Sequence, residues 1–127
     1  MHYGKRVLVH RKGAIRMLED EVGIIPGSMG TPSYIVQGLG NPASFMSASH
    51  GAGRKMSRTQ ADKTISVADA DNAMRGIVYG RWSRDRKGRV DLSECPLAYK
   101  DIEEIIQLEL DLIKPLIKLR PLGSLKG

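Results

Sequence analysis

The chain has 127 residues, which is enough for one domain with a single hydrophobic core. Its 20 lysines and arginines outnumber 14 acidic residues and give a net charge of +6, so a polyanion such as nucleic acid would be attracted to it. The one cysteine, Cys95, excludes an internal disulfide and suits a reducing compartment. Because the sequence has neither an apolar run long enough to cross a bilayer nor a signal-peptide core, we expect a soluble cytoplasmic protein that needs no membrane.

Short apolar runs predict strands in the first third of the chain. Residues 5–10 and 14–17 have β-like composition and are separated by a turn at 11–13, which predicts a hairpin. An apolar strand around 23–25 is followed by a loop with two glycines and two prolines, and another strand begins near Ser33. Such a loop can bring backbone and hydroxyl groups close to a ligand, although it also fits a purely structural turn.

A capping pattern marks the first predicted helix. Ser66 is followed three residues later by Asp69, which resembles a capping box. We therefore expect a helix from Val67 to Arg75 that is closed by Gly76, and then a short strand over 77–79.

The second predicted helix covers residues 101–113. Its first turn is acidic, and apolar residues recur at helical spacing through the rest of it. Pro115 should end or kink this helix, and residues 116–120 should form a last strand. The fold class is therefore α+β, with a mixed β-sheet and flanking helices, and the pattern does not reveal the strand order.

Residues 50–58 are the strongest candidates for chemistry. Small residues around Ala52 leave the imidazole of His50 unshielded, and two arginines follow it four residues apart. If the stretch is helical, His50, Arg54 and Arg58 share one face and can converge on one anion, for which phosphate is the candidate. A neutral imidazole there could act as a nucleophile or as an acid or base. The alternative is a turn histidine followed by a solvated helix face.

Residues 80–89 combine five basic side chains with the only tryptophan, Trp82. This mixture could bind backbone phosphates while a base stacks on the indole. An exposed hairpin loop with solvated charges is the alternative.

Seven short motifs follow one another along nearly the whole chain. They are His10-Arg-Lys-Gly-Ala14, Ile25-Pro-Gly-Ser-Met-Gly-Thr31, Ser33-Tyr34, His50-Gly-Ala-Gly-Arg54, Ser57-Arg58, Pro96-Leu-Ala-Tyr-Lys100 and Arg120-Pro-Leu-Gly-Ser-Leu-Lys-Gly127. Together they resemble the C-terminal part of the RtcB-type RNA-splicing ligases. The resemblance implies that residues 1–127 are a single partial domain, the guanylate-binding and catalytic part of an RtcB-like fold.

The resemblance also implies a reaction, the one that serves tRNA splicing and RNA repair. An RNA 3′-phosphate or 2′,3′-cyclic phosphate end would be joined to a 5′-hydroxyl end, with GTP and Mn²⁺ as cofactors. His50 would be the nucleophile that becomes guanylylated, and Arg54 and Arg58 would complete the catalytic set. The residues carried over as guanylate contacts are Pro26, Gly27, Ser28, Met29, Ser33, Gly51, Ala52, Gly53, Tyr99 and Lys126.

The family's manganese ligands belong to a half that precedes these motifs, so no metal ligand is carried onto this chain. We therefore expect a C-terminal fragment or split subunit that is inactive without the metal-binding half. The implied partners are RNA (tRNA halves or broken RNA), GTP, a separate N-terminal chain and an archease-type helper protein. Two alternatives stay open: a non-catalytic RNA- or nucleotide-binding module derived from such a ligase, and a poorly folded remnant with an exposed sheet edge.

Overall fold

The computed structural model describes residues 2–125 of the chain. Its helices and strands, in chain order, are β1 (Ala14–Arg16), β2 (Val22–Ile25), β3 (Ser33–Gly38), β4 (Ser47–Ser49), α1 (Arg58–Thr64), α2 (Val67–Ala73), β5 (Val78–Tyr79), α3 (Ile102–Leu108), β6 (Ile113–Leu119) and β7 (Gly123–Ser124). Two 3₁₀ turns, Pro42–Ser44 and Pro96–Ala98, lie between them. The α+β class predicted from the sequence is confirmed.

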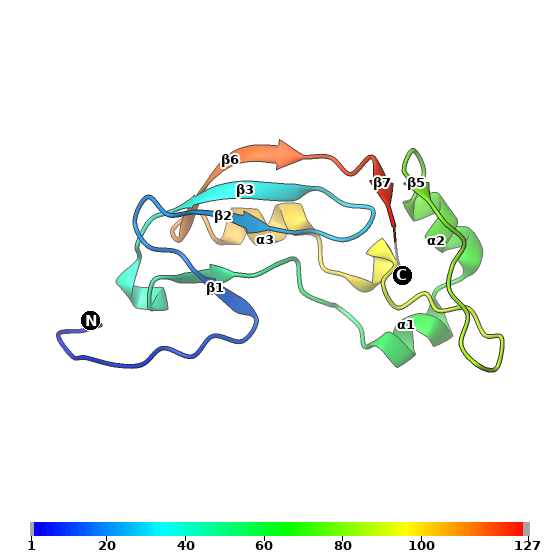
Figure 1. Cartoon of the computed structure of the whole chain (residues 1–127), viewed down its shortest axis with the longest axis horizontal. Coiled ribbons are helices and arrows are strands. Elements are labelled where there is room, and N and C mark those ends of the chain that lie inside the picture. Colours follow the sequence, from blue (N-terminus) through cyan, green and yellow to red (C-terminus); the bar gives the residue numbers. More distant parts are fainter. Residues whose placement is uncertain (1, 126–127) are drawn as a thin grey trace.

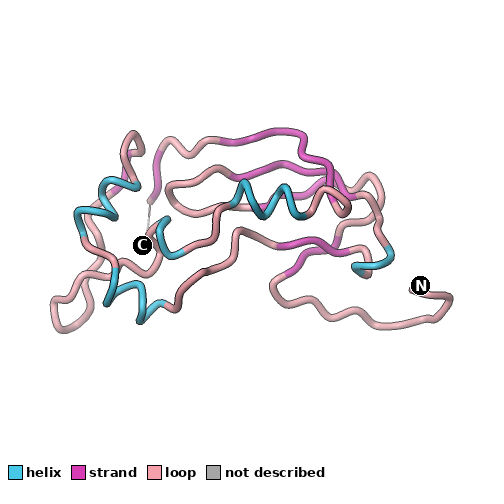
Figure 2. Tube along the Cα trace, turned by 180° about the vertical axis from the view of Figure 1, so that it is seen from behind, coloured by secondary structure: helices cyan, strands magenta, loops and turns pink. Residues whose placement is uncertain are grey.

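The largest sheet in the described residues is antiparallel, with the strand order β2-β3-β6. Alternate residues of β3, beginning with Tyr34 and Val36, are buried, as expected for a strand with one face on the core. Helix α3 covers that face, and its Ile102 and Ile106 belong to the same buried cluster as the strand residues (Figures 1 and 2). Burial of these side chains fixes the sheet against the helix.

The last helix is shorter than predicted, and Pro115 lies inside a strand instead of ending the helix. Helix α3 stops at Leu108, and β6 already begins at Ile113, which is buried in the main core. The register shifts opposite Ile35 and Val36, so Leu116 is left between two paired positions as a bulge. Since proline has no N–H to donate, an edge strand with a bulge is where a sheet tolerates it.

The predicted hairpin over residues 5–17 is wrong. Residues 6–13 have no regular secondary structure, and β1 instead pairs antiparallel with β4, which aligns Ala14 with Ser49. This pairing places Ala48 and Ile15 at the main core. The short run Ser47–Ser49 has no strong β-propensity, so only the long-range contact explains why it becomes a strand.

Helices α1 and α2 lie at the opposite end of the molecule from the N-terminal segment (Figure 1). The hydroxyl of Ser57 accepts the N–H of Gln60 and caps α1. The hydroxyl of Ser66 accepts the N–H of Asp69 and caps α2, and this second cap was predicted. Gly76 follows α2 with a φ of +84°. A second buried cluster, Ala70, Leu92 and Cys95, supports this end.

Strand β5 confirms the strand expected after α2, and it pairs in parallel with β7 near the C-terminus. The N–H of Val78 also donates to the carbonyl of Leu122 at 3.0 Å. The tail is thereby held against the segment that precedes Trp82. None of the helices within residues 2–125 has the length and apolarity needed to span a bilayer.

Candidate active site

Three segments that are far apart in the sequence meet beside the main sheet. They are the loop 26–32 between β2 and β3, residues 51–55 after β4, and residues 96–100 before α3. The N–H of Ala52 donates to the carbonyl of Pro26 at 3.1 Å, and the N–H of Lys100 donates to the carbonyl of Gly53 at 2.9 Å. Eight of the ten predicted guanylate contacts lie on these segments, the exceptions being Ser33 and Lys126, and the fold brings the segments together.

The loop 26–32 is held by its own hydroxyl groups. The hydroxyl of Thr31 accepts the N–H of Ser28 at 2.7 Å, and the two side-chain oxygens are 2.8 Å apart. The hydroxyl of Ser33 accepts the N–H of Gly27 at 3.4 Å. The loop also packs closely on the third segment, because a Cβ added to Gly30 would lie 2.5 Å from Cγ of Pro96.

Gly51 and Gly53 have different local roles. Gly51 is buried, and an added Cβ would lie 3.2 Å from the carbonyl oxygen of Pro26. Gly53 has a φ of +72°, a conformation that glycine adopts at no steric cost. The two glycines therefore let the chain pass tightly over loop 26–32 and then turn toward residues 96–100.

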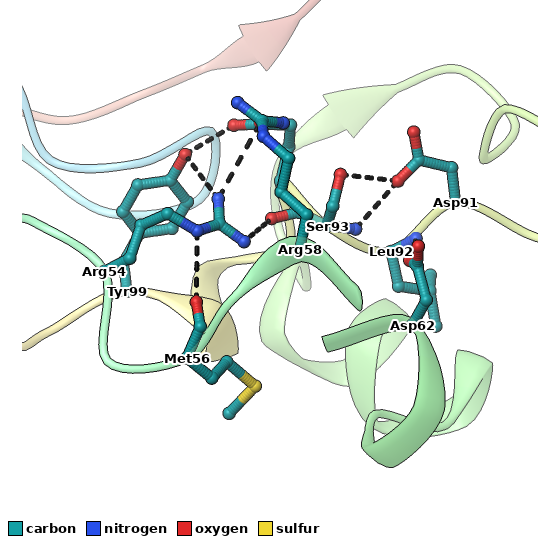
Figure 3. A network of polar contacts seen from close by, with 9 residues as sticks. Arg54, Met56, Arg58, Asp62, Asp91, Leu92, Ser93 and Tyr99 are labelled. Atoms are coloured by element: carbon teal, nitrogen blue, oxygen red, sulfur yellow. Dashed lines mark hydrogen bonds and ion pairs between the residues drawn. The ribbon is translucent and has the colours of Figure 1, made fainter. Parts of the chain in front are cut away.

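The guanidinium group of Arg54 joins these segments to residues 93–94 (Figure 3). Its Nη2 donates to the carbonyl of Ser93 at 2.5 Å, its Nε donates to the carbonyl of Met56 at 3.1 Å, and its Nη1 donates to the hydroxyl of Tyr99 at 3.3 Å. The same group lies 5.0 Å from the centre of the Tyr99 ring, which adds a cation–π contact. Arg54 therefore has a fixed orientation.

The carboxylate of Glu94 is the point on which both arginines converge. It accepts hydrogen bonds from Arg58 and from the Tyr99 hydroxyl, and Nη1 of Arg54 lies 3.8 Å from its Oε1. Burial, followed by the neighbouring Glu94, raises the pKa of the Tyr99 phenol, which keeps the phenol protonated as a donor at neutral pH. Sequence reasoning missed Glu94, since no motif or spacing singles out a lone acid before Cys95.

His50 lies apart from this network, and the helical face suggested for residues 50–58 is wrong. The chain turns helical only at Arg58, because Gly53 interrupts it and Arg54 forms a β-bridge with Tyr99. The imidazole is exposed, and its Nδ1 would lie 3.9 Å from a Cβ added to Gly13. The two arginines therefore both reach the carboxylate of Glu94, while His50 follows β4 and its N–H bonds to the carbonyl of Gly13.

The segment that carries His50 is anchored by a buried carboxylate. Oε1 of Glu109, at the end of α3, accepts the N–H of Ser49 at 2.5 Å, and its Oε2 is buried without a hydrogen-bond partner in residues 2–125. Burial raises the pKa of Glu109. The N–H of His50 itself donates to the carbonyl of Gly13 at 3.3 Å. Contacts with two other segments, at Gly13 and at Glu109, therefore hold the backbone that carries the His50 ring.

A cavity of about 80 Å³ connects loop 26–32 with the tail. Met29, Glu94, Ser124 and Leu125 line it together with residues 79–83. Lys126, a predicted guanylate contact, lies outside the described residues. Ser124 and Leu125, which come just before it in the sequence, line this cavity.

Comparisons with known proteins identify the family. The family model for the tRNA-splicing ligase RtcB matches residues 1–127. The chain belongs to the RtcB family. The RNA-splicing ligase RtcB1 of Escherichia coli ATCC 25922 is 44% identical over 127 residues, covering 100% of this chain and 30% of that protein. The RNA-splicing ligase RtcB of Mycobacterium tuberculosis is 42% identical, covering 97% and 32%, and the tRNA-splicing ligase RtcB of Nanoarchaeum equitans is 35% identical, covering 97% and 29%.

The chain thus spans about 30% of the length of the RtcB relatives that it matches. The groups here that could meet a phosphate are the cavity beside Met29 and Glu94 and the exposed guanidinium group of Arg58, which pairs with Glu94. Within residues 2–125, no three side chains of His, Cys, Asp or Glu are grouped so that they could hold a metal ion. The expectation that the manganese ligands belong to another part of an RtcB protein stays a prediction.

Proposed function

We propose that this chain supplies the histidine nucleophile and one wall of the guanylate pocket in an RNA ligase of RtcB type. Such a ligase would join an RNA 3′-phosphate or 2′,3′-cyclic phosphate end to a 5′-hydroxyl end. The observation that carries the proposal is the packing of loop 26–32, residues 51–55 and residues 96–100 against one another, with Met29 of that loop lining the neighbouring cavity. A shared pocket is the simplest reason for three separate motifs of one family to pack together.

In the proposed reaction, a nitrogen of the His50 imidazole attacks the α-phosphorus of GTP. An N–P bond forms, the bond to the bridging oxygen breaks, and pyrophosphate leaves. The guanylyl group then passes to the RNA 3′-phosphate, and the RNA 5′-hydroxyl displaces GMP. The exposure of the His50 ring suits this role, since the ring can be reached from solvent without unfolding the site.

The two arginines would have different tasks. Three hydrogen bonds fix the guanidinium group of Arg54. Its task would therefore be to hold residues 93–99 in place, and it would not move toward the substrate. Arg58 is exposed and contacts Glu94, so an incoming phosphate could share or replace that carboxylate. An arginine that exchanges one anion for another can stabilise charge as it develops on a transferring phosphoryl group.

A bound Mn²⁺ would supply the main charge stabilisation for the departing pyrophosphate. We propose that its ligands come from the remaining length of an RtcB protein, either as a separate N-terminal chain or as one polypeptide. We therefore expect this chain to be inactive, or nearly so, on its own. Cytoplasmic location and an archease-type helper protein stay predictions.

Incubation with α-labelled GTP and manganese tests the proposal. The chain is assayed alone and together with an N-terminal RtcB segment, and His50→Ala is compared with His10→Ala, because His10 is also exposed. We expect label only in the reconstituted pair, lost in His50→Ala, kept in His10→Ala, and labile in acid but stable in alkali. Label that survives His50→Ala would refute the proposal, and GTP binding without any label would favour the non-catalytic module.

A further inference from the structure

A second hollow lies next to the proposed active site, at the end of the molecule formed by α2 and β5. It is an open depression, called the groove below, with a volume of about 770 Å³. Two aromatic side chains, two arginines and two valines contribute to its lining: Tyr79, Trp82, Arg81, Arg84, Val67 and Val90. This combination of rings and guanidinium groups is what a nucleic acid strand needs, because bases stack on rings and phosphates pair with arginines.

The aromatic pair is held in one orientation. The ring centres of Tyr79 and Trp82 are 5.4 Å apart, with an angle of 51° between the planes. Oδ1 of Asp71 accepts both the Tyr79 hydroxyl at 2.6 Å and the indole N–H of Trp82 at 2.7 Å. These two donors hold the pKa of Asp71 below its usual value. Trp82 also packs against the second core cluster, so the platform is pre-organised and a ligand would not have to order it.

The arginines in the groove keep donors available. Arg81 is exposed, and within residues 2–125 its guanidinium group takes part in no hydrogen bond or ion pair. Arg84 uses Nη1 to donate to the carbonyl of Gly88 at 2.7 Å, which leaves its other nitrogens for a ligand. Arg89, by contrast, is paired with Asp85 at 2.8 Å. The positive charge that faces the groove therefore comes from Arg81 and Arg84.

The groove adjoins the cavity that the proposed function assigns to the guanylate. Residues 79–82 line both the groove and the smaller cavity that contains Met29 and Glu94. A strand lying on the aromatic pair would therefore reach that cavity at one end. The position fits an RNA whose terminal phosphate is presented for guanylyl transfer.

We propose that this groove binds single-stranded RNA, with a base stacked on Trp82 and backbone phosphates on Arg81 and Arg84. The choice of RNA over another polyanion rests on the proposed function. A single strand is required because a double helix hides the faces of its bases. The alternatives, a duplex or a phosphate chain without bases, become outcomes of the test.

The sequence offers a direct probe, since Trp82 is its only tryptophan. Intrinsic fluorescence of the chain is titrated with single-stranded oligoadenylate of about ten nucleotides, within the usual site size of such grooves. The same titration is made with an RNA duplex of equal length and with inorganic polyphosphate. We expect the single strand to quench the fluorescence at the lowest concentration. No quenching, or equal quenching by all three probes, would overturn the proposal.

Two pairs of variants separate stacking and charge from folding, with anisotropy of a labelled oligonucleotide as the readout. Trp82→Ala should weaken binding roughly 5- to 150-fold, whereas Trp82→Phe, which keeps a ring, should lose less. Since Trp82 contributes to a core cluster, the decisive pair is Arg81→Ala against Arg6→Ala, which remove the same charge from exposed side chains. Arg6 precedes β1 in the N-terminal segment, at the opposite end of the molecule (Figure 1).

Arg81→Ala should weaken binding and flatten the dependence of log Kd on log salt by about 0.7, the value for one lost phosphate contact on a single strand. Arg6→Ala should leave that slope unchanged, and equal effects of the two substitutions would refute the groove. These measurements contain no GTP, so guanylylation does not contribute to them. RNA binding with quenching but without guanylylation would refute the proposed function and support the groove. Guanylylation without quenching would support the proposed function and refute the groove.

Discussion

Replacement of Gly27 by alanine should damage the loop that carries the proposed guanylate contacts. A Cβ at this position would lie 2.1 Å from the carbonyl oxygen of Pro32 and 2.7 Å from the hydroxyl oxygen of Thr31. A backbone oxygen cannot turn away as a flexible side chain can. The loop must therefore shift, and with it the segment of Ala52, whose N–H donates to the neighbouring carbonyl of Pro26.

The expected loss of stability follows from that overlap. Forcing an extra carbon into a packed site costs about 1 to 3 kcal/mol. With an unfolding entropy of about 2.1 cal/mol/K per residue, a chain of 127 residues should lose about 4 to 11 °C in Tm. The matched control is Gly80→Ala, since a Cβ there meets nothing within 4 Å in the described residues. That exposed substitution should change Tm by about 2 °C or less.

The assay is thermal unfolding followed by circular dichroism, with the two glycine variants and the parent chain measured side by side. Histidine labelling by α-labelled GTP in the reconstituted pair gives the functional readout. Gly27→Ala should lose label more than it loses folded protein at the assay temperature, and Gly80→Ala should keep its stability. If Gly27→Ala unfolds within 2 °C of the parent, the loop accommodates the methyl group and the packing argument is wrong.

Three further predictions concern groups whose pKa is raised by burial. Tyr99→Phe keeps the ring but removes the donor to Glu94, so we expect a loss of about 1 kcal/mol in urea unfolding, and an unchanged midpoint would contradict this. The raised pKa of Glu109 means that its contribution to stability is complete below its ordinary value of 4.5 and is lost as pH rises through the folded value. Glu109→Gln, which can still accept the Ser49 N–H, should flatten this dependence in urea midpoints from about pH 4 to pH 7, and parallel curves would count against it. Burial raises the pKa of Cys95, so its thiol should react with a disulfide reagent only on unfolding, and rapid reaction in the native chain would be inconsistent with that.

Local signals in the sequence predicted those elements whose causes are local. Ser66 caps α2 through its own hydroxyl, and the alternation from Ser33 onward needs only one buried face to form β3. The loop before Ser33 was recognisable from its glycines and prolines. In each case the physical cause lies within a few residues, so the pattern contained enough information.

The wrong predictions concern contacts between distant residues. Residues 5–10 have strand composition, yet β1 takes its partner from β4, whose Ala48 then enters the core. Helical spacing suggested that His50 and the arginines share a face, but Arg54 is drawn into a bridge with Tyr99. Glu94 gave no local signal at all. Its importance comes from a pairing that exists only once residues 54–58 and 93–99 have met.

The parallel pairing of β5 with β7 links the two proposed sites. A two-stranded sheet is marginally stable by itself, so this pair depends on the packing around it. A Cβ added to Gly123 would lie 3.1 Å from the carbonyl oxygen of Val78, which shows how closely the tail approaches the start of the aromatic platform. Tyr79 then contributes a ring to the groove, and Ser124, its partner in the register, contributes to the cavity. The pairing therefore fixes the position of the tail relative to Tyr79, while Asp71 and the second core cluster hold the aromatic pair itself.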